Sequence, residues 1–322
     1  MSNEILFTAA YTENDRQLVL KINAWLMQSG KTKASLSKST GINDGTRSSI
    51  LNGSYPSSPT PFLERMVAEI ERIDARNQAA KTEIPYTETD IAKRIHMVCS
   101  RAHIDRDFGY FAGRVGVGKT QALRAYAKKN QSAILIPVFQ GIDHSTFINE
   151  LIIKSGLVHS PGSISMQIAA IIRAFKGSDK VILIDEAEWL PARSFGALRR
   201  ISDESEIGVV LVGTPNLLPI VQDPDGRFGQ ISSRIGFWPS VVERVSESDC
   251  RLLVESYFSA PVEDAVFSAF FTCCEGSGRT LKNLLKNTYR TALRTGAEIS
   301  PANIKKINQD IMAGRCYGTG GL

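Results

Sequence analysis

Short runs of apolar residues alternate with amphipathic segments through the middle of the chain. The apolar runs are rich in Val, Ile and Leu and are bounded by turn residues, which is typical of buried strands. They lie at 108–112, 133–139, 180–185 and 208–213, with a fifth expected at 239–245. Apolar residues recur at helical spacing near 121–129, 145–155, 164–176, 194–204 and 247–258. Strands separated by helices predict an α/β fold with a parallel sheet that is covered on both faces.

The regions on either side of this alternation show helical patterns only. In the N-terminal region, the Ser/Pro-rich stretch 54–61 precedes an amphipathic helix with four aliphatic residues at helical spacing: Leu63, Val67, Ile70 and Ile73. The C-terminal region predicts helices near 262–273, 280–294 and 301–312. We therefore expect three domains: an all-α domain over 1–82, an α/β domain over 83–260 and a small helical lid over 261–322.

Residues 34–53 follow the pattern of two short helices joined by a tight turn at Gly41. This spacing is typical of a helix-turn-helix, whose second helix contacts DNA. The side chains expected at the DNA are those of Asn43, Asp44, Thr46, Arg47 and Ser48. Arg47 takes a position where such helices usually carry a core aliphatic residue, so either the helix is slightly rotated or the guanidinium reaches out of the core. A helical protein-interaction domain is the alternative interpretation.

Composition narrows the class of protein. A hydrophobic content of 43% and a charged content of 22% are typical of a globular protein. No apolar run approaches membrane-spanning length and the N-terminus does not resemble a signal peptide, so we expect a cytoplasmic protein with no membrane partner. The net charge of +5 is compatible with nucleic-acid binding without being diagnostic. The five cysteines include no C-x-x-C pair and are expected to be free thiols.

The octapeptide GRVGVGKT at 113–120 fits the phosphate-loop pattern G-x-x-x-x-G-K-T. It follows a predicted strand and opens a predicted helix, which places a bound phosphate chain at a helix N-terminus. The ammonium of Lys119 is expected on the β- and γ-phosphates of ATP, and the hydroxyl of Thr120 on Mg²⁺. The residues expected to bind the nucleotide here are Gly113, Arg114, Val115, Gly116, Val117, Gly118, Lys119, Thr120 and Gln121.

Two further strands end in residues suited to ATP hydrolysis. VILIDEAEW at 181–189 predicts that Asp185 holds the Mg²⁺ shell and that Glu186 polarises the attacking water, with Glu188 the next acid in line. VVLVGTP at 209–215 ends in Thr214, which would reach the γ-phosphate or the water because ligands bind at the carboxyl ends of parallel strands. Together with the phosphate loop, these strands predict an ATPase.

An ATPase also needs positive charge on the γ-phosphate, and often receives it from a neighbouring subunit. Two arginines are candidates: Arg234 in GQISSRIGF and Arg279 in GSGRTLKNLL. Arg227 and Arg244 are rivals for the role of Arg234.

The order of these motifs, with a helix-turn-helix pattern in front, resembles the bacteriophage Mu B family and its TnsC-type relatives. The resemblance implies an AAA+ ATPase that assembles with ATP as a homo-oligomeric filament or ring on double-stranded DNA, largely without sequence preference. It also implies delivery of target DNA to a DDE transposase, which stimulates hydrolysis. By position, Lys119 and Thr120 would be Walker A, Asp185 and Glu186 Walker B, Thr214 sensor 1, Arg234 a finger acting in trans, and Arg279 sensor 2.

One segment departs from the family pattern. The segment before Walker B is strongly basic in the Mu protein, whereas residues 158–167 here contain no Lys or Arg. Phosphate contacts to DNA would then come from other cations, and the candidates are Lys128, Lys129, Lys154, Arg173, Arg193, Arg199 and Arg200. Two alternatives remain open: a helicase-loader or initiator ATPase, and an ATP-gated helix-turn-helix transcription regulator. The Walker residues are complete and include Glu186, which argues against a regulator whose ATPase domain serves only as a switch and does not hydrolyse ATP.

Overall fold

The computed structural model describes residues 5–81, 84–158, 162–222 and 229–312 of the chain. By their internal contacts the residues divide into two compact units, Met1–Glu83 and Ile84–Leu322. Among the described residues, no helix is long and apolar enough to cross a membrane.

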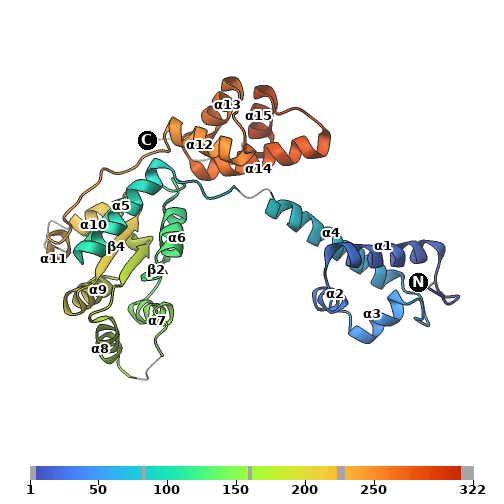
Figure 1. The fold of residues 1–322 in the computed structure, drawn as a ribbon, viewed down its shortest axis with the longest axis horizontal. Coiled ribbons are helices and arrows are strands. Elements are labelled where there is room, and N and C mark those ends of the chain that lie inside the picture. The colour runs from blue at the N-terminus through green and yellow to red at the C-terminus, as the bar shows by residue number, and fades with distance from the viewer. Residues whose placement is uncertain (1–4, 82–83, 159–161, 223–228, 313–322) are drawn as a thin grey trace. The chain divides into compact units, whose positions relative to one another are not determined.

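Within its described residues, the first unit contains the helices α1 (Glu13–Ser29), α2 (Lys33–Thr40), α3 (Asp44–Leu51) and α4 (Thr60–Lys81) (Figure 1). Helix α1 begins at a capping box, in which Thr12 and Asp15 satisfy each other's backbone N–H groups. Helices α1 and α2 both end at a glycine in the left-handed conformation. The unit has its own apolar core, which includes Val19, Ile22, Ile50 and Leu63.

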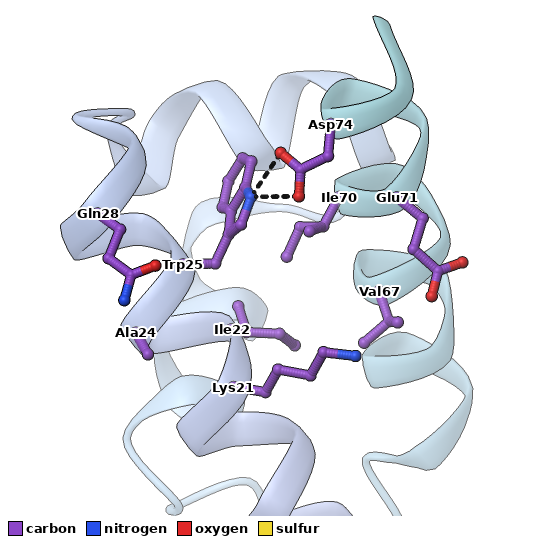
Figure 2. Close-up of a pocket in the computed structure, with 9 residues that line it drawn as sticks. All are labelled: Lys21, Ile22, Ala24, Trp25, Gln28, Val67, Ile70, Glu71 and Asp74. Carbon is purple, nitrogen blue, oxygen red and sulfur yellow. Dashed lines mark hydrogen bonds between the residues drawn. The ribbon is translucent and has the colours of Figure 1, made fainter. Parts of the chain in front are cut away.

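A polar contact ties α1 to α4 beside this core. The indole Nε1–H of Trp25 donates to both carboxylate oxygens of Asp74 at 2.9 Å (Figure 2). A pocket of about 350 Å³ lies next to this contact, and its lining includes the apolar Ile22, Val67 and Ile70. A buried carboxylate at the opposite end of the helix pair completes the connection, since Asp15 of α1 accepts a hydrogen bond from Thr60 of α4.

The second unit contains a four-stranded parallel sheet in the order β1–β4–β3–β2. The strands are β1 (Phe108–Ala112), β2 (Ala133–Pro137), β3 (Val181–Asp185) and β4 (Gly208–Gly213). Every residue of β1, β3 and β4 is buried. Because the strands run in one direction, the phosphate loop after β1, the acidic pair at the end of β3 and Thr214 after β4 meet at one edge of the sheet.

Helices cover both faces of the sheet, as predicted. One face packs against α7 (His144–Lys154), α8 (Ile164–Phe175) and α9 (Ala192–Ser205) through the buried Phe147, Phe175 and Phe195. The other face packs against α5 (Asp90–Asp105) and α6 (Lys119–Lys129). Shorter elements follow β3 and β4: η1 (Ala187–Trp189), α10 (Leu217–Gln222) and α11 (Gly229–Ser232). The architecture is therefore an α/β fold with a phosphate loop between β1 and α6.

In the described residues after α11, every element is helical; these helices are drawn in orange and red in Figure 1. They are α12 (Glu247–Phe258), α13 (Asp264–Cys274), α14 (Gly278–Thr295) and α15 (Pro301–Ile307), with a π-helical turn, η2, at Asn308–Met312. Their buried side chains, among them Phe270 and Leu284, belong to the same apolar cluster as α5 and α6. The cluster therefore joins the C-terminal helices to the sheet.

The structure differs from the predicted elements in two places. The prediction of a strand at 239–245 is wrong. In this segment only Val242 forms a bridge, to Gly113. Its N–H donates to the carbonyl of Ala112 at 3.0 Å, and its carbonyl accepts the N–H of Arg114 at 2.8 Å. A second single bridge joins Ile235 to Phe108, so this part of the chain touches the outer edge of β1 at two points without forming a ladder. Helix α5 was not predicted from the sequence, although Ile91, Ile95 and Val98 recur at helical spacing and form its buried face.

Candidate active site

The phosphate loop connects β1 to α6 through two glycines that carry positive φ angles. Gly116 has φ +88° and Gly118 has φ +108°, a region that other residues rarely adopt. Helix α6 begins at Lys119, directly after Gly118, so its first N–H groups have no partner within the helix and face the loop. The loop therefore supplies a concave set of N–H donors at a helix N-terminus, which is an arrangement suited to phosphate.

Lys119 lies inside this loop and is only 8% exposed. Its Nζ donates to the backbone oxygens of Gly113 at 2.6 Å and Arg114 at 3.0 Å. Burial lowers the pKa of Lys119, while the carboxylates of Glu188, Asp185 and Glu186 act in the opposite direction. The ammonium thus sits between the loop carbonyls and the acids at the ends of the strands.

Asp185 ends β3 and is 4% exposed. Burial raises the pKa of its carboxyl, and a hydrogen bond from Thr120 together with the charge of Lys119 opposes this shift. Its Oδ1 is buried and has no hydrogen-bond partner among the described residues. A buried carboxylate oxygen without a partner, beside a threonine hydroxyl, is suited to a hard cation.

No cluster of three or more His, Cys, Asp or Glu side chains that could hold a metal occurs in the described part of the chain. This result is compatible with Mg²⁺ at a phosphate loop, because that ion is bound by few protein ligands and takes the rest from phosphates and water.

Glu186 directly follows Asp185, and Thr214 follows β4, the neighbour of β3, so the three residues lie at the same edge of the sheet. Glu186 is exposed and adopts the left-handed conformation with φ 59°, which is uncommon for a residue other than glycine and frequent at functional sites. The Oγ1 of Thr214 is buried and lacks a partner within the described residues. Both residues line the same pocket as Lys119.

Arg279 approaches this pocket from the C-terminal helices. Its backbone N–H donates to the carbonyl of Gly116 at 3.1 Å, so the start of α14 rests on the tip of the phosphate loop. A Cβ on Gly116 would lie 2.8 Å from the Ser277 hydroxyl, and a Cβ on Gly278 would lie 3.0 Å from the carbonyl of Gly116. The two glycines therefore allow this close approach.

The pocket has a volume of about 510 Å³. It includes most of the predicted nucleotide-binding residues, from Val115 to Gln121, together with Asp185, Glu186, Thr214 and Arg279. Gly113 and Arg114 are not among its lining residues, and the Arg114 guanidinium instead pairs with Glu243 at 2.6 Å.

One wall of the pocket was not found by sequence reasoning. It comes from the segment before α5, from the first turn of α5 and from the C-terminal helices. Its residues are Ile84, Pro85, Tyr86, Thr87, Thr89, Ala92, Leu253, Leu281, Lys282 and Asn283. Its apolar members and the half-exposed ring of Tyr86 could accept a flat base. No motif marks the segment 84–89, and only the folding of the chain brings it to the phosphate loop.

Arg234 lies outside this pocket. Its Nη1 pairs with Asp203 of α9 at 2.6 Å, and 43% of its side chain is exposed. Of its rivals, Arg227 falls outside the described residues, whereas Arg244 packs against Gly276 before α14. Arg234 thus contributes nothing to the nucleotide pocket of its own chain.

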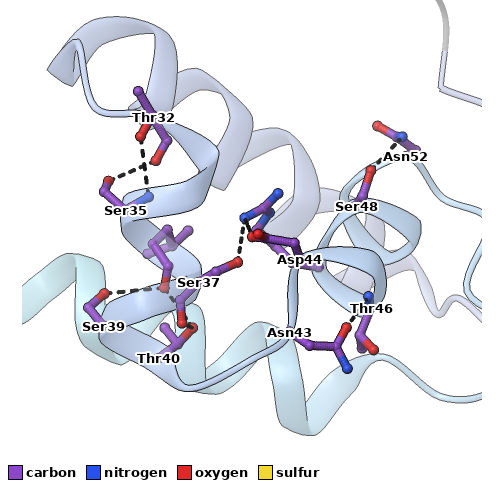
Figure 3. A network of polar contacts seen from close by, with 12 residues as sticks. Thr32, Ser35, Ser37, Ser39, Thr40, Asn43, Asp44, Thr46, Ser48 and Asn52 are labelled. Carbon is purple, nitrogen blue, oxygen red and sulfur yellow. Dashed lines mark hydrogen bonds and ion pairs between the residues drawn. The ribbon is translucent and has the colours of Figure 1, made fainter.

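The predicted DNA-contacting residues of the first unit begin at the turn between α2 and α3 and continue along α3, where Ser48 lies next to Asn52 (Figure 3). Asn43 caps α3 by accepting the Thr46 N–H at 2.7 Å, and Ser48 accepts a hydrogen bond from Asn52. Asn43 is exposed, and Thr46 and Ser48 are half-buried.

Arg47 is buried, unlike the other residues predicted to contact DNA. It is 7% exposed, and its Nη1 donates to the Ser37 hydroxyl and, at 2.6 Å, to the Asp44 carboxylate. These partners replace water around the guanidinium, so Arg47 joins α2 to α3 and is not presented to DNA in this structure. The hydrogen bonds from Ser37 and Arg47 lower the pKa of Asp44.

The seven candidate cations for DNA contact divide into two groups. Lys129, Arg199 and Arg200 pair with Glu88, Asp203 and Glu204 at 3.6, 3.7 and 2.7 Å. The remaining four are exposed and form no ion pair within the described ranges: Lys128, Lys154, Arg173 and Arg193. The segment 158–167 lies partly outside those ranges.

The chain is similar to several known proteins. Residues 103–221 match the AAA domain family. The chain is 25% identical over 256 residues to the Mu-like prophage FluMu DNA transposition protein B of Haemophilus influenzae, covering 77% of this chain and 88% of that protein. It is 24% identical over 222 residues to the ATP-dependent target DNA activator B of Escherichia phage Mu, covering 68% of this chain and 70% of that protein. Among solved structures, a Walker-type ATPase of Pyrococcus abyssi matches with a TM-score of 0.49 and 13% identity over 73% of this chain and 77% of that one.

Proposed function

Because this chain is a MuB-like ATPase of the AAA+ class, we propose that it is an ATP-dependent activator of target DNA in transposition. In this proposal it acts in the cytoplasm and assembles with ATP as a filament or ring on double-stranded DNA, largely without sequence preference. It then delivers the DNA to a DDE transposase and is released by ATP hydrolysis. The observation that carries the proposal is the single pocket that brings Lys119, Asp185, Glu186, Thr214 and Arg279 together, in a chain whose relatives are transposition proteins.

The residues around the pocket fit ATP and Mg²⁺. Lys119 and the N–H groups of the loop would bind the β- and γ-phosphates, and Thr120 and Asp185 would hold Mg²⁺. The ion would neutralise charge on the phosphates. The base would lie against the wall that contains Tyr86 and Leu253, because this wall is the apolar part of the pocket.

Nucleotide binding requires one rearrangement inside the loop. Lys119 now donates to the carbonyls of Gly113 and Arg114, and it must exchange these acceptors for phosphate oxygens. The exchange favours binding because a charged acceptor forms a stronger hydrogen bond than a neutral carbonyl. Glu186 then acts as the base that polarises the attacking water, and Thr214 orients that water or the γ-phosphate.

Arg234 has a role only in an assembly. Since it lies outside the pocket of its own chain and is partly exposed, it is available to a neighbouring protomer once its pair with Asp203 opens. We assign it as a finger that stabilises charge on the γ-phosphate of the next protomer. Arg279, at the start of α14, supplies positive charge from the same chain.

The DNA path in this proposal uses the exposed cations that lack an acidic partner. His144 and Ser194 lie within hydrogen-bond distance, 3.0 Å, so the first turn of α9, which carries Arg193, is close to the start of α7. Burial and the positive charge of Arg193 both lower the pKa of the His144 imidazole. With Lys154 at the end of α7, Arg193 is the first choice for phosphate contacts. In the N-terminal domain, Asn43, Thr46 and Ser48 remain proposed DNA contacts.

Electron microscopy of the full-length protein with plasmid DNA and a non-hydrolysable ATP analogue tests the proposal. We expect DNA of any sequence to be coated at a regular spacing, and expect bare DNA when the nucleotide is omitted. Lys119→Ala should also leave the DNA bare, because it removes the contact with the phosphates. Protection of one palindromic site would instead indicate a transcription regulator. Binding to a hexameric helicase without coating of DNA would indicate a loader.

A further inference from the structure

Glu188 lies behind the nucleotide pocket, in the short helix η1 that follows Asp185 and Glu186. It is not among the lining residues of the pocket. Its side chain reaches from the end of β3 to the end of β4, where Oε1 accepts the backbone N–H of Thr214 at 3.1 Å. One carboxylate thus connects the turn that carries the acids to the residue that faces the γ-phosphate position.

The last residue of β4 leaves space for this carboxylate. A Cβ on Gly213 would lie 2.2 Å from Glu188 Oε2 and 3.1 Å from the side chain of Leu217. Any other residue at this position would push the carboxylate away from Thr214. The absence of a side chain at Gly213 therefore leaves the space that the Glu188 carboxylate occupies, and Gly213 itself does not have a positive φ.

The Glu188 carboxylate also interacts electrostatically with Lys119. Its Oε2 is buried and has no hydrogen-bond partner in the described part of the chain. Among the acids near Lys119, Glu188 makes the largest contribution against the lowering of the Lys119 pKa, ahead of Asp185 and Glu186. A buried carboxylate without a second partner is tolerated here because the ammonium of Lys119 compensates its charge.

We propose that Glu188 is a positioning residue that holds Thr214 in register with the Asp185–Glu186 turn, and that it is not a second general base. Its hydrogen bond fixes the main chain of Thr214, which leaves the Thr214 hydroxyl available to the nucleotide or the attacking water. Catalysis depends closely on the position of the groups at a reacting centre, since a displacement of about 1 Å can reduce the rate roughly 100-fold. The inference rests on the role proposed above for Thr214.

Two substitutions separate a positioning role from a basic one. Glu188→Gln keeps an acceptor oxygen for the Thr214 N–H and removes the charge, whereas Glu188→Ala removes both. We expect kcat for ATP hydrolysis by the full chain to fall roughly 10- to 100-fold in Glu188→Ala, with KM for ATP changed much less. Glu188→Gln should restore most of the lost activity. The control is Glu204→Gln, an exposed glutamate paired with Arg200, which should behave as wild type.

A general base would give a different pattern, because glutamine cannot accept a proton. Equal losses in Glu188→Gln and Glu188→Ala would therefore overturn the proposal, as would wild-type turnover in both. A double substitution with Thr214→Ala adds a second criterion. If Glu188 acts through Thr214, Glu188→Ala should reduce kcat much less in the Thr214→Ala background than in the wild type.

Hydrogen exchange provides a readout that needs no turnover. The Thr214 amide should exchange slowly in the wild type and in Glu188→Gln, and faster in Glu188→Ala, measured in a peptide that spans 209–217. Unchanged exchange in Glu188→Ala would overturn the inference even if the protein had no role in transposition. Conversely, failure to coat DNA would contradict the proposed function and leave this measurement intact.

Discussion

At the scale of single residues, Glu186 tests whether binding and hydrolysis are separate. Glu186→Gln preserves shape and hydrogen bonding but cannot polarise water, so turnover should fall by roughly two to four orders of magnitude. DNA binding that depends on ATP should persist, because Lys119 and Asp185 are unchanged. Steady-state ATPase and DNA-binding assays on the same preparation measure both properties. Hydrolysis at the wild-type rate would remove Glu186 from the catalytic role.

Asp185 predicts a dependence of stability on pH. Burial raises the pKa of this carboxyl above its ordinary value of 3.8, so the folded chain binds the proton more tightly than the unfolded chain. The corresponding stability is present below pH 3.8 and is lost as the pH rises through the folded-state pKa. Asp185→Asn should therefore raise the Tm of the nucleotide-free protein at neutral pH, and this advantage should disappear at acid pH.

The same substitution should abolish Mg²⁺-dependent hydrolysis, because a neutral amide is a poor ligand for Mg²⁺. Thermal unfolding without nucleotide or Mg²⁺, at several pH values, measures the stability effect. Asp105→Asn is the control, since Asp105 lies exposed at the end of α5 and surface changes typically alter stability by less than about 0.5 kcal/mol. A lower Tm for Asp185→Asn at neutral pH would contradict the assignment of burial as the dominant effect.

At the scale of elements, the contact between α14 and the phosphate loop can be tested with two glycines. Gly116 and Gly141 have similar φ angles of +88° and +90°, so alanine causes backbone strain at both. Only at Gly116 would the new Cβ also meet α14, at 2.8 Å from the Ser277 hydroxyl, whereas Gly141 has open space around it. We expect Gly116→Ala to weaken ATP binding about 10-fold or more, since about 1.4 kcal/mol corresponds to that factor.

Gly141→Ala is the matched variant and should lose stability from strain while it retains the affinity for ATP. Titration with a fluorescent ATP analogue measures affinity, and thermal unfolding measures stability. Equal affinities in the two variants would show that contact between α14 and the loop has no influence on nucleotide binding.

The segment before α5 can be tested by two truncations. Removal of residues 1–82 should leave ATP binding intact, because every residue that lines the pocket lies at Ile84 or beyond. A truncation that begins at Asp90 also removes 84–89 and should lose most of its affinity. The pair of affinities locates the domain boundary that we propose. If the protein that lacks only residues 1–82 does not bind ATP, although circular dichroism shows that it is folded, the proposed boundary is contradicted.

At the scale of the whole molecule, the proposed assembly depends on a residue that no single chain uses. Arg234→Ala should bind ATP but hydrolyse it poorly and fail to assemble on DNA, because charge on the γ-phosphate is no longer neutralised by the neighbour. Glu186→Gln carries an intact Arg234, and Arg234→Ala carries an intact Glu186. Mixed on DNA, the two variants should form some complete sites and recover part of the ATPase activity.

The mixture should therefore be more active than either component at the same total concentration. If it remains inactive while co-assembly is demonstrated independently, Arg234 does not act in trans, and Arg244 and Arg227 take its place as candidates.

The sequence by itself determined the features that depend on neighbouring residues. The phosphate loop needs glycines and a lysine in one contiguous stretch, and the buried strands β1, β3 and β4 are unbroken apolar runs, so the pattern along the chain is enough to identify them. The rule that ligands bind at the carboxyl ends of parallel strands then brought Lys119, Asp185 and Thr214 to one edge of the sheet. The pocket contains all three.

Only the tertiary structure decided which distant segments meet. Nothing local in 84–89 distinguishes a wall of the pocket from a linker, and nothing local in Val242 shows that the chain leaves the sheet at Gly113. The sequence left open whether the Arg47 guanidinium reaches out of the core, and only the packing of α2 against α3 places Ser37 and Asp44 around it. Glu188 looked like a reserve base until its bond to Thr214 was seen. The physical reason is the same in each case, because burial and hydrogen bonding depend on partners that only packing brings together.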